Sequence, residues 1–170
     1  NRYHLLSRIN SNKQTELYVY DASSQTRKKI WPTTKSPLEP WLAIPQVIKA
    51  EFSPDNQKLL LWLRKDKSQT VAVLDFSGSE ASYTYQIDLA TIPATKIVWN
   101  PGSQSELIAL VTNEVKAISL GQKQKVTTSS REKRVIDFSI ESDNNIYYVR
   151  ENTSGYTLMK MQADGSNKSV

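Results

Sequence analysis

Few residues of this chain are of the types that perform catalysis. Its 170 residues include one histidine, His4, and no cysteine. This composition excludes a two-histidine metal site, a thiolate zinc site and a cysteine nucleophile, and it leaves His4 as a lone candidate for a general base. His4 falls within a short alternating apolar segment, so we interpret it as a strand residue that is exposed or hydrogen-bonded. The sequence predicts no catalytic residue, and we expect the chain not to be an enzyme.

Acidic side chains offer two further sites for chemistry. Glu141 and Asp143 could form a pair of carboxylates for hydrolysis, and Asp143, Asn144 and Asn145 offer oxygen ligands of the kind that calcium prefers. The tract lacks the alternating acidic spacing and the distal glutamate of a calcium loop, and acids are common in turns. Neither common type of glycine-rich phosphate loop occurs in the sequence. We therefore predict a turn here, with no metal site and no cofactor.

Basic residues form three clusters, at positions 27–29, 64–67 and 131–134, and the net charge of the chain is +5. Cations beside aromatic residues are one pattern of nucleic-acid binding. Here the clusters fall at similar places in successive parts of the chain, and two of them contain an acid, as solvated loops do. We predict that the chain binds no nucleic acid. No apolar run approaches the roughly 20 residues that cross a bilayer, which predicts no membrane-spanning segment.

The elements that must position these residues are short strands. Segments of four to six apolar or alternating residues recur along the chain, bounded by Asp, Asn, Ser, Gly or Pro. They lie at 3–6, 16–20, 58–63, 70–74, 107–111, 145–149 and 156–161. No stretch keeps the helical spacing of apolar residues for three turns with caps at both ends. The sequence predicts an all-β chain.

Three segments of the chain repeat one pattern, in which a strand carrying an aromatic residue runs into a turn. The aromatic residues are Phe52, Trp99 and Phe138, which lie 47 and 39 residues apart. A second strand begins seven or eight residues after each of them, and a third strand follows. Each repeat is therefore an antiparallel meander of an inner, a second, a third and a variable outer strand. A period of about 40 to 50 residues with four strands is typical of a β-propeller blade.

We predict a β-propeller, or part of one, with about four antiparallel four-stranded blades. The blades fall at about residues 1–34, 47–92, 95–130 and 134–170, with a proline-rich connection at 35–46. The opening repeat lacks an anchoring aromatic, because 3–9, 16–21 and 28–31 match the second, third and fourth strands. We therefore expect a segment of a larger ring, which would associate with itself or pair with missing blades through open edges and faces. A closed ring of four blades is the alternative.

The second repeat carries a specific resemblance. Its anchor reads Phe52-Ser53-Pro54-Asp55-Asn56, and its later strand ends in Asp75 before a glycine turn at 76–78. These residues resemble the TolB-like propeller repeat, a relative of the Trp-Asp repeat, which typically has glycine where Asn56 stands. The third repeat keeps the proline in the tract 99–102, and the fourth keeps the closing turn in 161–165. The resemblance covers residues 3–170, with one strong copy and three weakened ones.

The resemblance implies a function as well as a fold. It implies a non-enzymatic scaffold for protein–protein contact, located outside the cytoplasm of bacteria, in the periplasm or at the cell surface. One alternative is the substrate-gating propeller of a prolyl-oligopeptidase-type peptidase, whose catalytic domain lies elsewhere in its chain. Another is a propeller that binds a sugar or a peptide. The absence of cysteine is compatible with either side of the membrane.

We expect a protein partner to bind the loop surface that carries tryptophan and arginine, since these residue types most often anchor interfaces. The residues predicted to form this interaction surface are Trp31, Trp41, Arg131, Lys133 and Arg134. The two tryptophans flank or occupy the proline-rich connection, and the basic residues precede the last anchor.

Overall fold

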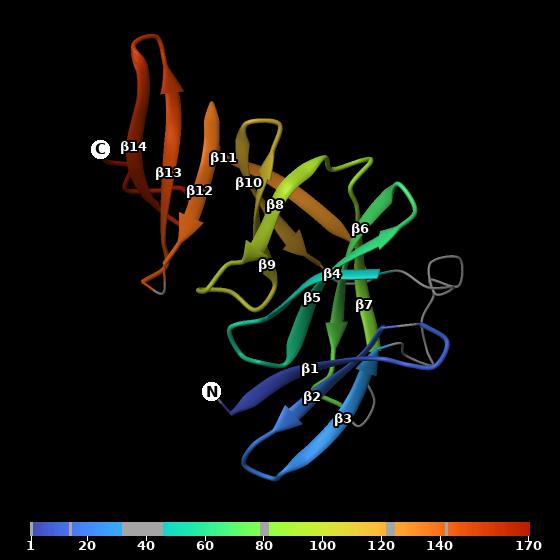
Figure 1. The fold of residues 1–170 in the computed structure, drawn as a ribbon. Helices are drawn as coiled ribbons and strands as arrows, with labels where there is room; N and C mark the ends of the chain where they lie inside the picture. Colours follow the sequence, from blue (N-terminus) through green and yellow to red (C-terminus); the bar gives the residue numbers. More distant parts are fainter. Residues whose placement is uncertain (1, 14, 32–45, 79–81, 122–124, 142) are drawn as a thin grey trace. The chain divides into compact units, whose positions relative to one another are not determined.

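The structure is a computed structural model that describes residues 2–13, 15–31, 46–78, 82–121, 125–141 and 143–170. These residues form fourteen strands and no helix (Figure 1). The strands are β1 (Tyr3–Ile9), β2 (Thr15–Asp21), β3 (Thr26–Trp31), β4 (Gln46–Phe52), β5 (Lys58–Lys65), β6 (Ser68–Asp75), β7 (Ser82–Asp88), β8 (Ala94–Trp99), β9 (Glu106–Val111), β10 (Glu114–Leu120), β11 (Val126–Lys133), β12 (Val135–Ile140), β13 (Asn145–Asn152) and β14 (Gly155–Gln162). The predicted all-β class is confirmed.

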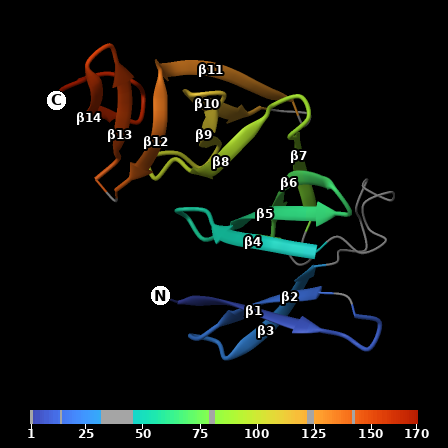
Figure 2. The ribbon, with the colours of Figure 1, turned by 45° about the horizontal axis from the view of Figure 1, so that its top comes forward.

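The strands form four sheets, and each sheet is a meander of consecutive strands. Sheets β4–β7 and β8–β11 have four strands, while sheets β1–β3 and β12–β14 have three among the described residues. The chain divides into two compact units, Asn1–Ile87 and Asp88–Val170, each built around two of these sheets (Figure 2). After β14, the predicted fourth strand is represented by one antiparallel bridge between Lys160 and Ser169. The blade boundaries stay a prediction. Residues 35–45 of the predicted proline-rich connection lie outside the described residues.

One backbone hydrogen bond recurs in all four sheets. The donor is the N–H of a residue at the end of the strand in the third position (Leu120 ends β10, and the other three donors directly follow β2, β6 and β14), and the acceptor is the carbonyl of the residue just before the strand in the second position. The four donor–acceptor pairs are Ala22 to Arg2 (2.9 Å), Phe76 to Gln57 (3.0 Å), Leu120 to Ser105 (2.8 Å) and Ala163 to Asn144 (3.1 Å). The bond therefore places β1, β5, β9 and β13 at equivalent positions in their sheets, although the side chains at these positions have little in common.

The turns after the anchors also keep one geometry with different side chains. In the second repeat, Asp55 Oδ1 accepts a hydrogen bond from the Gln57 N–H at 3.1 Å. In the fourth repeat, Asp143 Oδ1 accepts from the Asn145 N–H at 3.1 Å. In the third repeat, where no aspartate follows the proline, the amide oxygen of Asn100 takes over and accepts from the Gly102 N–H at 3.0 Å. The third and fourth copies of the motif, although weakened in sequence, thus each preserve a side-chain-capped turn.

Each unit has its own core, formed where the apolar faces of its two sheets meet. In the first unit, side chains of β2 and β3 join alternate leucines of β5 and residues of β6. The buried members are Leu17, Val19, Ile30, Trp31, Leu59, Leu61, Leu63, Ala72, Leu74 and Phe76. In the second unit, residues of β9 and β10 pack against residues of β12–β14. The buried members include Ile108, Ala117, Phe138, Tyr148, Met159 and Met161. A sheet with an apolar face gains stability only when another layer covers that face.

The position of Asn56 yields a test of the turn. Asn56 has a φ of 57°, in the left-handed region, and its side chain is exposed. We expect Asn56→Ala to lower the free energy of unfolding by about 1 kcal/mol. Asparagine adopts left-handed backbone angles more readily than alanine, whose Cβ is strained there. Asn56→Gly should be neutral within about 0.5 kcal/mol. Urea unfolding of both variants measures this, and an alanine variant as stable as the glycine variant would contradict it.

Candidate protein interface on the first sheet

The structure buries one of the predicted interface tryptophans. Trp31, the last residue of β3, is only 2% exposed and belongs to the core of the first unit. Its ring lies there because its position in β3 pairs with Leu17 of β2, on the face of the sheet that packs inward. Trp31 therefore stabilises the fold and does not present its ring to a partner. Trp41, the other predicted tryptophan, lies outside the described residues.

The predicted basic cluster lies in the second unit. Arg131 is half-buried, and its Nη2 lies 3.2 Å from Glu106 Oε2, so this side chain has a structural partner. Lys133 and Arg134 are exposed, at the end of β11 and in the tight turn that leads to β12. Trp31 and this cluster thus belong to different compact units. A role for Lys133 and Arg134 in partner binding stays a prediction.

The other candidate residues have ordinary surroundings. His4 is exposed on β1, and its ring centroid lies 6.3 Å from that of Tyr20. Asp143 is held in its turn by Asn145, whose side-chain and backbone N–H groups lower the pKa of the carboxyl. Within the described part of the chain, no three His, Cys, Asp or Glu side chains are grouped closely enough to hold a metal ion. The described residues also contain no helix long and apolar enough to cross a membrane.

A different set of residues gathers on the first sheet. The face of β1–β3 that points away from the core carries three cross-strand rows, which we call the outer face. The rows are His4, Tyr20 and Arg27; Leu6, Tyr18 and Lys29; and Arg8 with Glu16. Alternation along each strand puts these residues on one side and the core residues Leu17 and Val19 on the other. The outer face is therefore aromatic and basic where the inner face is apolar.

Glu16 links side chains from all three strands of the outer face. Its Oε2 accepts hydrogen bonds from Arg8 Nη2 at 2.6 Å and from the Tyr18 hydroxyl at 2.9 Å. Its Oε1 accepts from Lys29 Nζ at 2.7 Å. These bonds, that from Lys29 first, lower the pKa of the Glu16 carboxyl from 4.5 to about 2. Glu16 is consequently an anion at neutral pH that locks three side chains from three strands in place.

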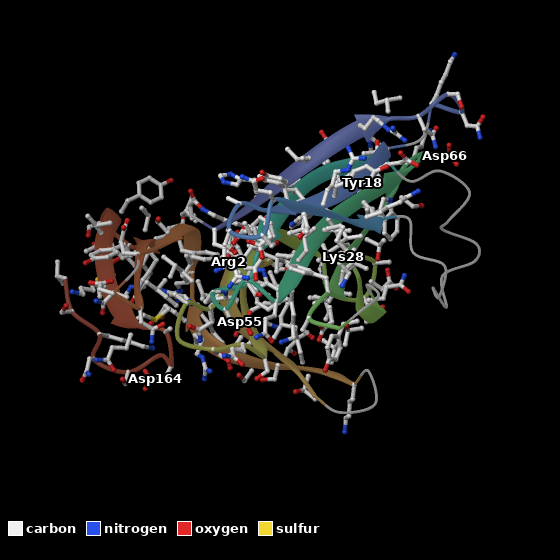
Figure 3. All side chains as sticks on the ribbon, turned by 90° about the horizontal axis from the view of Figure 1, so that it is seen from below. Arg2, Tyr18, Lys28, Asp55, Asp66 and Asp164 are labelled. Atoms are coloured by element: carbon white, nitrogen blue, oxygen red, sulfur yellow. The ribbon has the colours of Figure 1, made fainter. Side chains whose placement is uncertain are left out.

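The basic groups outnumber the acidic one. Arg8, Arg27 and Lys29 carry three positive charges on the outer face, against the single carboxylate of Glu16. The Arg27 guanidinium lies 4.7 Å from the centre of the Tyr18 ring, and that of Arg8 lies 5.8 Å from it. The Arg8 side chain is 60% exposed and that of Lys29 is 43% exposed. Tyr18 is labelled in Figure 3. The outer face thus presents an oriented, positively charged surface.

Such a surface suits the recognition of another protein. Tyrosine and arginine supply large contact areas and are enriched at the centres of interfaces. The guanidinium and ammonium groups can donate charge-assisted hydrogen bonds to carboxylates of a partner. Sequence reasoning assigned Arg27 and Lys29 to a solvated cluster and missed this set. The available signal was the alternation of Glu16, Tyr18 and Tyr20 in one strand and of Arg27 and Lys29 in another.

The first unit also has a cavity of about 330 Å³ that borders Asp21, Lys28 and Gln57. Its charged groups, Lys28 and Asp21, make hydrogen bonds and an ion pair within the first unit. Lys28 Nζ donates to the carbonyl oxygens of Phe76, at 2.9 Å, and of Gly78, which ties β3 to the next sheet. Asp21 Oδ2 lies 2.7 Å from Arg2 Nη2. The cavity is therefore bordered by ion pairs and hydrogen bonds within the unit, and the outer face is the better candidate site.

The lowered pKa of Glu16 yields a prediction about stability. A carboxyl whose folded pKa lies below its ordinary value stabilises the fold above about pH 4.5, and this contribution is lost as the pH falls toward 2. We expect the stability advantage of the wild type over Glu16→Gln to be largest near neutral pH and to shrink below pH 4.5. Urea unfolding of both proteins across this range measures it. A difference that does not vary with pH would contradict the assigned network.

Comparisons with known proteins bear on the fold. No model of a known protein family matches the chain, and no curated protein does. Among solved structures, TolB from Acinetobacter baumannii superposes with a TM-score of 0.53 at 11% identity, over 99% of this chain and 40% of TolB. A Lactobacillus plantarum protein gives 0.45 at 16% identity, over 99% of this chain and 54% of that one. A candidate 6-phosphogluconolactonase from Bacteroides fragilis gives a TM-score of 0.43 at 11% identity, over 98% of this chain and 53% of that one.

This chain therefore spans about half the length of these proteins or less. The likeness to TolB, at 11% identity, concerns the fold and not the activity. Together with the four meander sheets, it shows that the chain has the β-propeller fold.

Proposed function

We propose that the chain is a non-enzymatic β-propeller scaffold that binds a partner protein through the outer face of β1–β3. The observation that supports this most is the arrangement around Glu16 and Tyr18. Arg8 and Lys29 are hydrogen-bonded to the Glu16 carboxylate, and the Arg27 guanidinium lies against the Tyr18 ring of the same sheet face. Side chains that are ordered before binding lose little conformational entropy when a partner arrives, which favours affinity.

The charge of the outer face indicates the chemistry of the partner. Since the outer face carries three cations and one carboxylate, an acidic protein surface is complementary to it. Arg27 is the residue best suited to contact such a partner, because it is exposed and stacks on Tyr18. The resemblance of the repeats to TolB-like repeats extends the proposal to a location outside the bacterial cytoplasm, where scaffold propellers of this kind contact other proteins.

A photo-crosslinking experiment tests the proposed interface. The crosslinker p-benzoylphenylalanine replaces Tyr20, and the protein is irradiated in cells of its source organism. We expect a discrete adduct, because Tyr20 lies on the outer face beside Arg27. Arg27→Glu should reduce the adduct by about tenfold or more, since it places like charges opposite one another.

Two matched variants control for charge and for exposure. Arg64→Glu makes the same charge change at an exposed position on β5 and should leave the adduct intact. The crosslinker at Tyr156, an exposed tyrosine of β14 in the second unit, should not give the same adduct. The proposal fails if no adduct forms at position 20, or if Arg27→Glu and Arg64→Glu reduce it equally.

A further inference from the structure

One carboxylate neutralises part of the positive charge of the outer face. Glu16 Oε2 accepts hydrogen bonds from Arg8 Nε at 3.0 Å and Arg8 Nη2 at 2.6 Å, and Glu16 Oε1 accepts from Lys29 Nζ at 2.7 Å. Both cations are therefore already paired within the protein. Arg27 differs from them, because its guanidinium lies on the Tyr18 ring and no carboxylate of the described residues pairs with it. The outer face thus offers one unpaired cation out of three.

The Glu16 carboxylate is held in place and stays charged. Its side chain is only 8% exposed, and the Tyr18 hydroxyl donates a further hydrogen bond to it at 2.9 Å. The bonds from Lys29, Arg8 and Tyr18 lower the pKa of the carboxyl to about 2, so it is ionised at every physiological pH. An anion that approaches Arg8 or Lys29 consequently meets a fixed negative charge.

Apart from Glu16, the outer face has the composition of a surface that binds single-stranded nucleic acid. Such surfaces combine aromatic rings, on which bases stack, with cations that contact the phosphates. Tyr18 and Tyr20 supply the rings on β2, while the cations Lys29 and Arg27 lie opposite them on β3. Affinity for a nucleic acid grows with the number of phosphates that cations of the protein contact. With two of the three cations paired to Glu16, that number is small.

We infer that Glu16 is a specificity-determining residue, which keeps single-stranded nucleic acid off the outer face and leaves Arg27 to a partner that brings a single carboxylate. A protein partner needs one charge-assisted hydrogen bond at Arg27 and gains further contact area from Tyr20 and Leu6, the latter 43% exposed. A nucleic acid needs several cations at once and brings its other phosphates close to Glu16. This role of Glu16 rests on the proposed function, because it concerns the selectivity of the same face.

The test measures binding of a short fluorescein-labelled oligodeoxythymidine by fluorescence anisotropy. We expect the wild type to bind it weakly and Glu16→Gln to bind it about tenfold or more tightly, because Arg8 and Lys29 are then free to contact phosphates. The slope of log affinity against log salt concentration should also become steeper by about 1.4. This value corresponds to two further phosphate contacts at roughly 0.7 each on a single strand.

Two more variants separate this effect from net charge and from loss of the fold. Glu114→Gln removes a carboxylate that pairs with Lys116 at 3.3 Å in the second unit, and it should leave the affinity for the oligonucleotide unchanged. Leu6→Lys adds a cation opposite Tyr18 and removes none of the groups bonded to Glu16. It should therefore raise the affinity even if Glu16→Gln does not fold.

The role of Glu16 is overturned if the wild type binds the oligonucleotide as tightly as Glu16→Gln does, or if Glu114→Gln gives the same gain. Should Glu16→Gln not fold, an unchanged affinity of Leu6→Lys overturns it. No partner protein takes part in this experiment, so its result is distinct from that of the crosslinking test. An adduct at Tyr20 together with equal oligonucleotide affinities would support the interface and overturn the selectivity assigned to Glu16.

Discussion

The structure depends on one constraint, which is that a β-meander cannot leave both of its faces in water. The apolar faces of neighbouring sheets therefore meet in a core within each unit, where Trp31 and Leu61 lie in the first unit and Phe138 and Met161 in the second. A face that is not needed for the core is free to carry other side chains. In the first sheet, it carries the basic and aromatic residues of the outer face.

Backbone geometry, more than side-chain identity, makes the four sheets equivalent. The N–H of Ala22, Phe76, Leu120 and Ala163 makes the same bond in each sheet, and only one of these side chains is aromatic. Likewise, the turn after an anchor is capped by Asp55 in one repeat and by Asn100 in another. This explains why one copy of the repeat motif is strong in sequence and the others are weak, although their strands pair alike.

The strands, their order and the propeller repeat could be predicted from the sequence, because alternation and turn residues are local signals. The candidate interface could not, because it depends on register between strands. Trp31 was expected at a surface, but a residue at the end of β3 points inward or outward according to a bulge opposite Leu17 and Tyr18. Glu16, Arg8 and Lys29 come together only when β1, β2 and β3 pair as they do.

The central claim is that the two faces of β2 have different tasks, one in folding and one in binding. Leu17 and Tyr18 are adjacent residues on opposite faces, so the free energies of unfolding of Leu17→Ala and Tyr18→Ala test it most directly. We expect Leu17→Ala to cost about 2–5 kcal/mol, as a cavity in the core does, and Tyr18→Ala to cost about 1 kcal/mol. Equal losses would contradict the claim, because Tyr18 would then contribute as much to the fold as a residue of the core does.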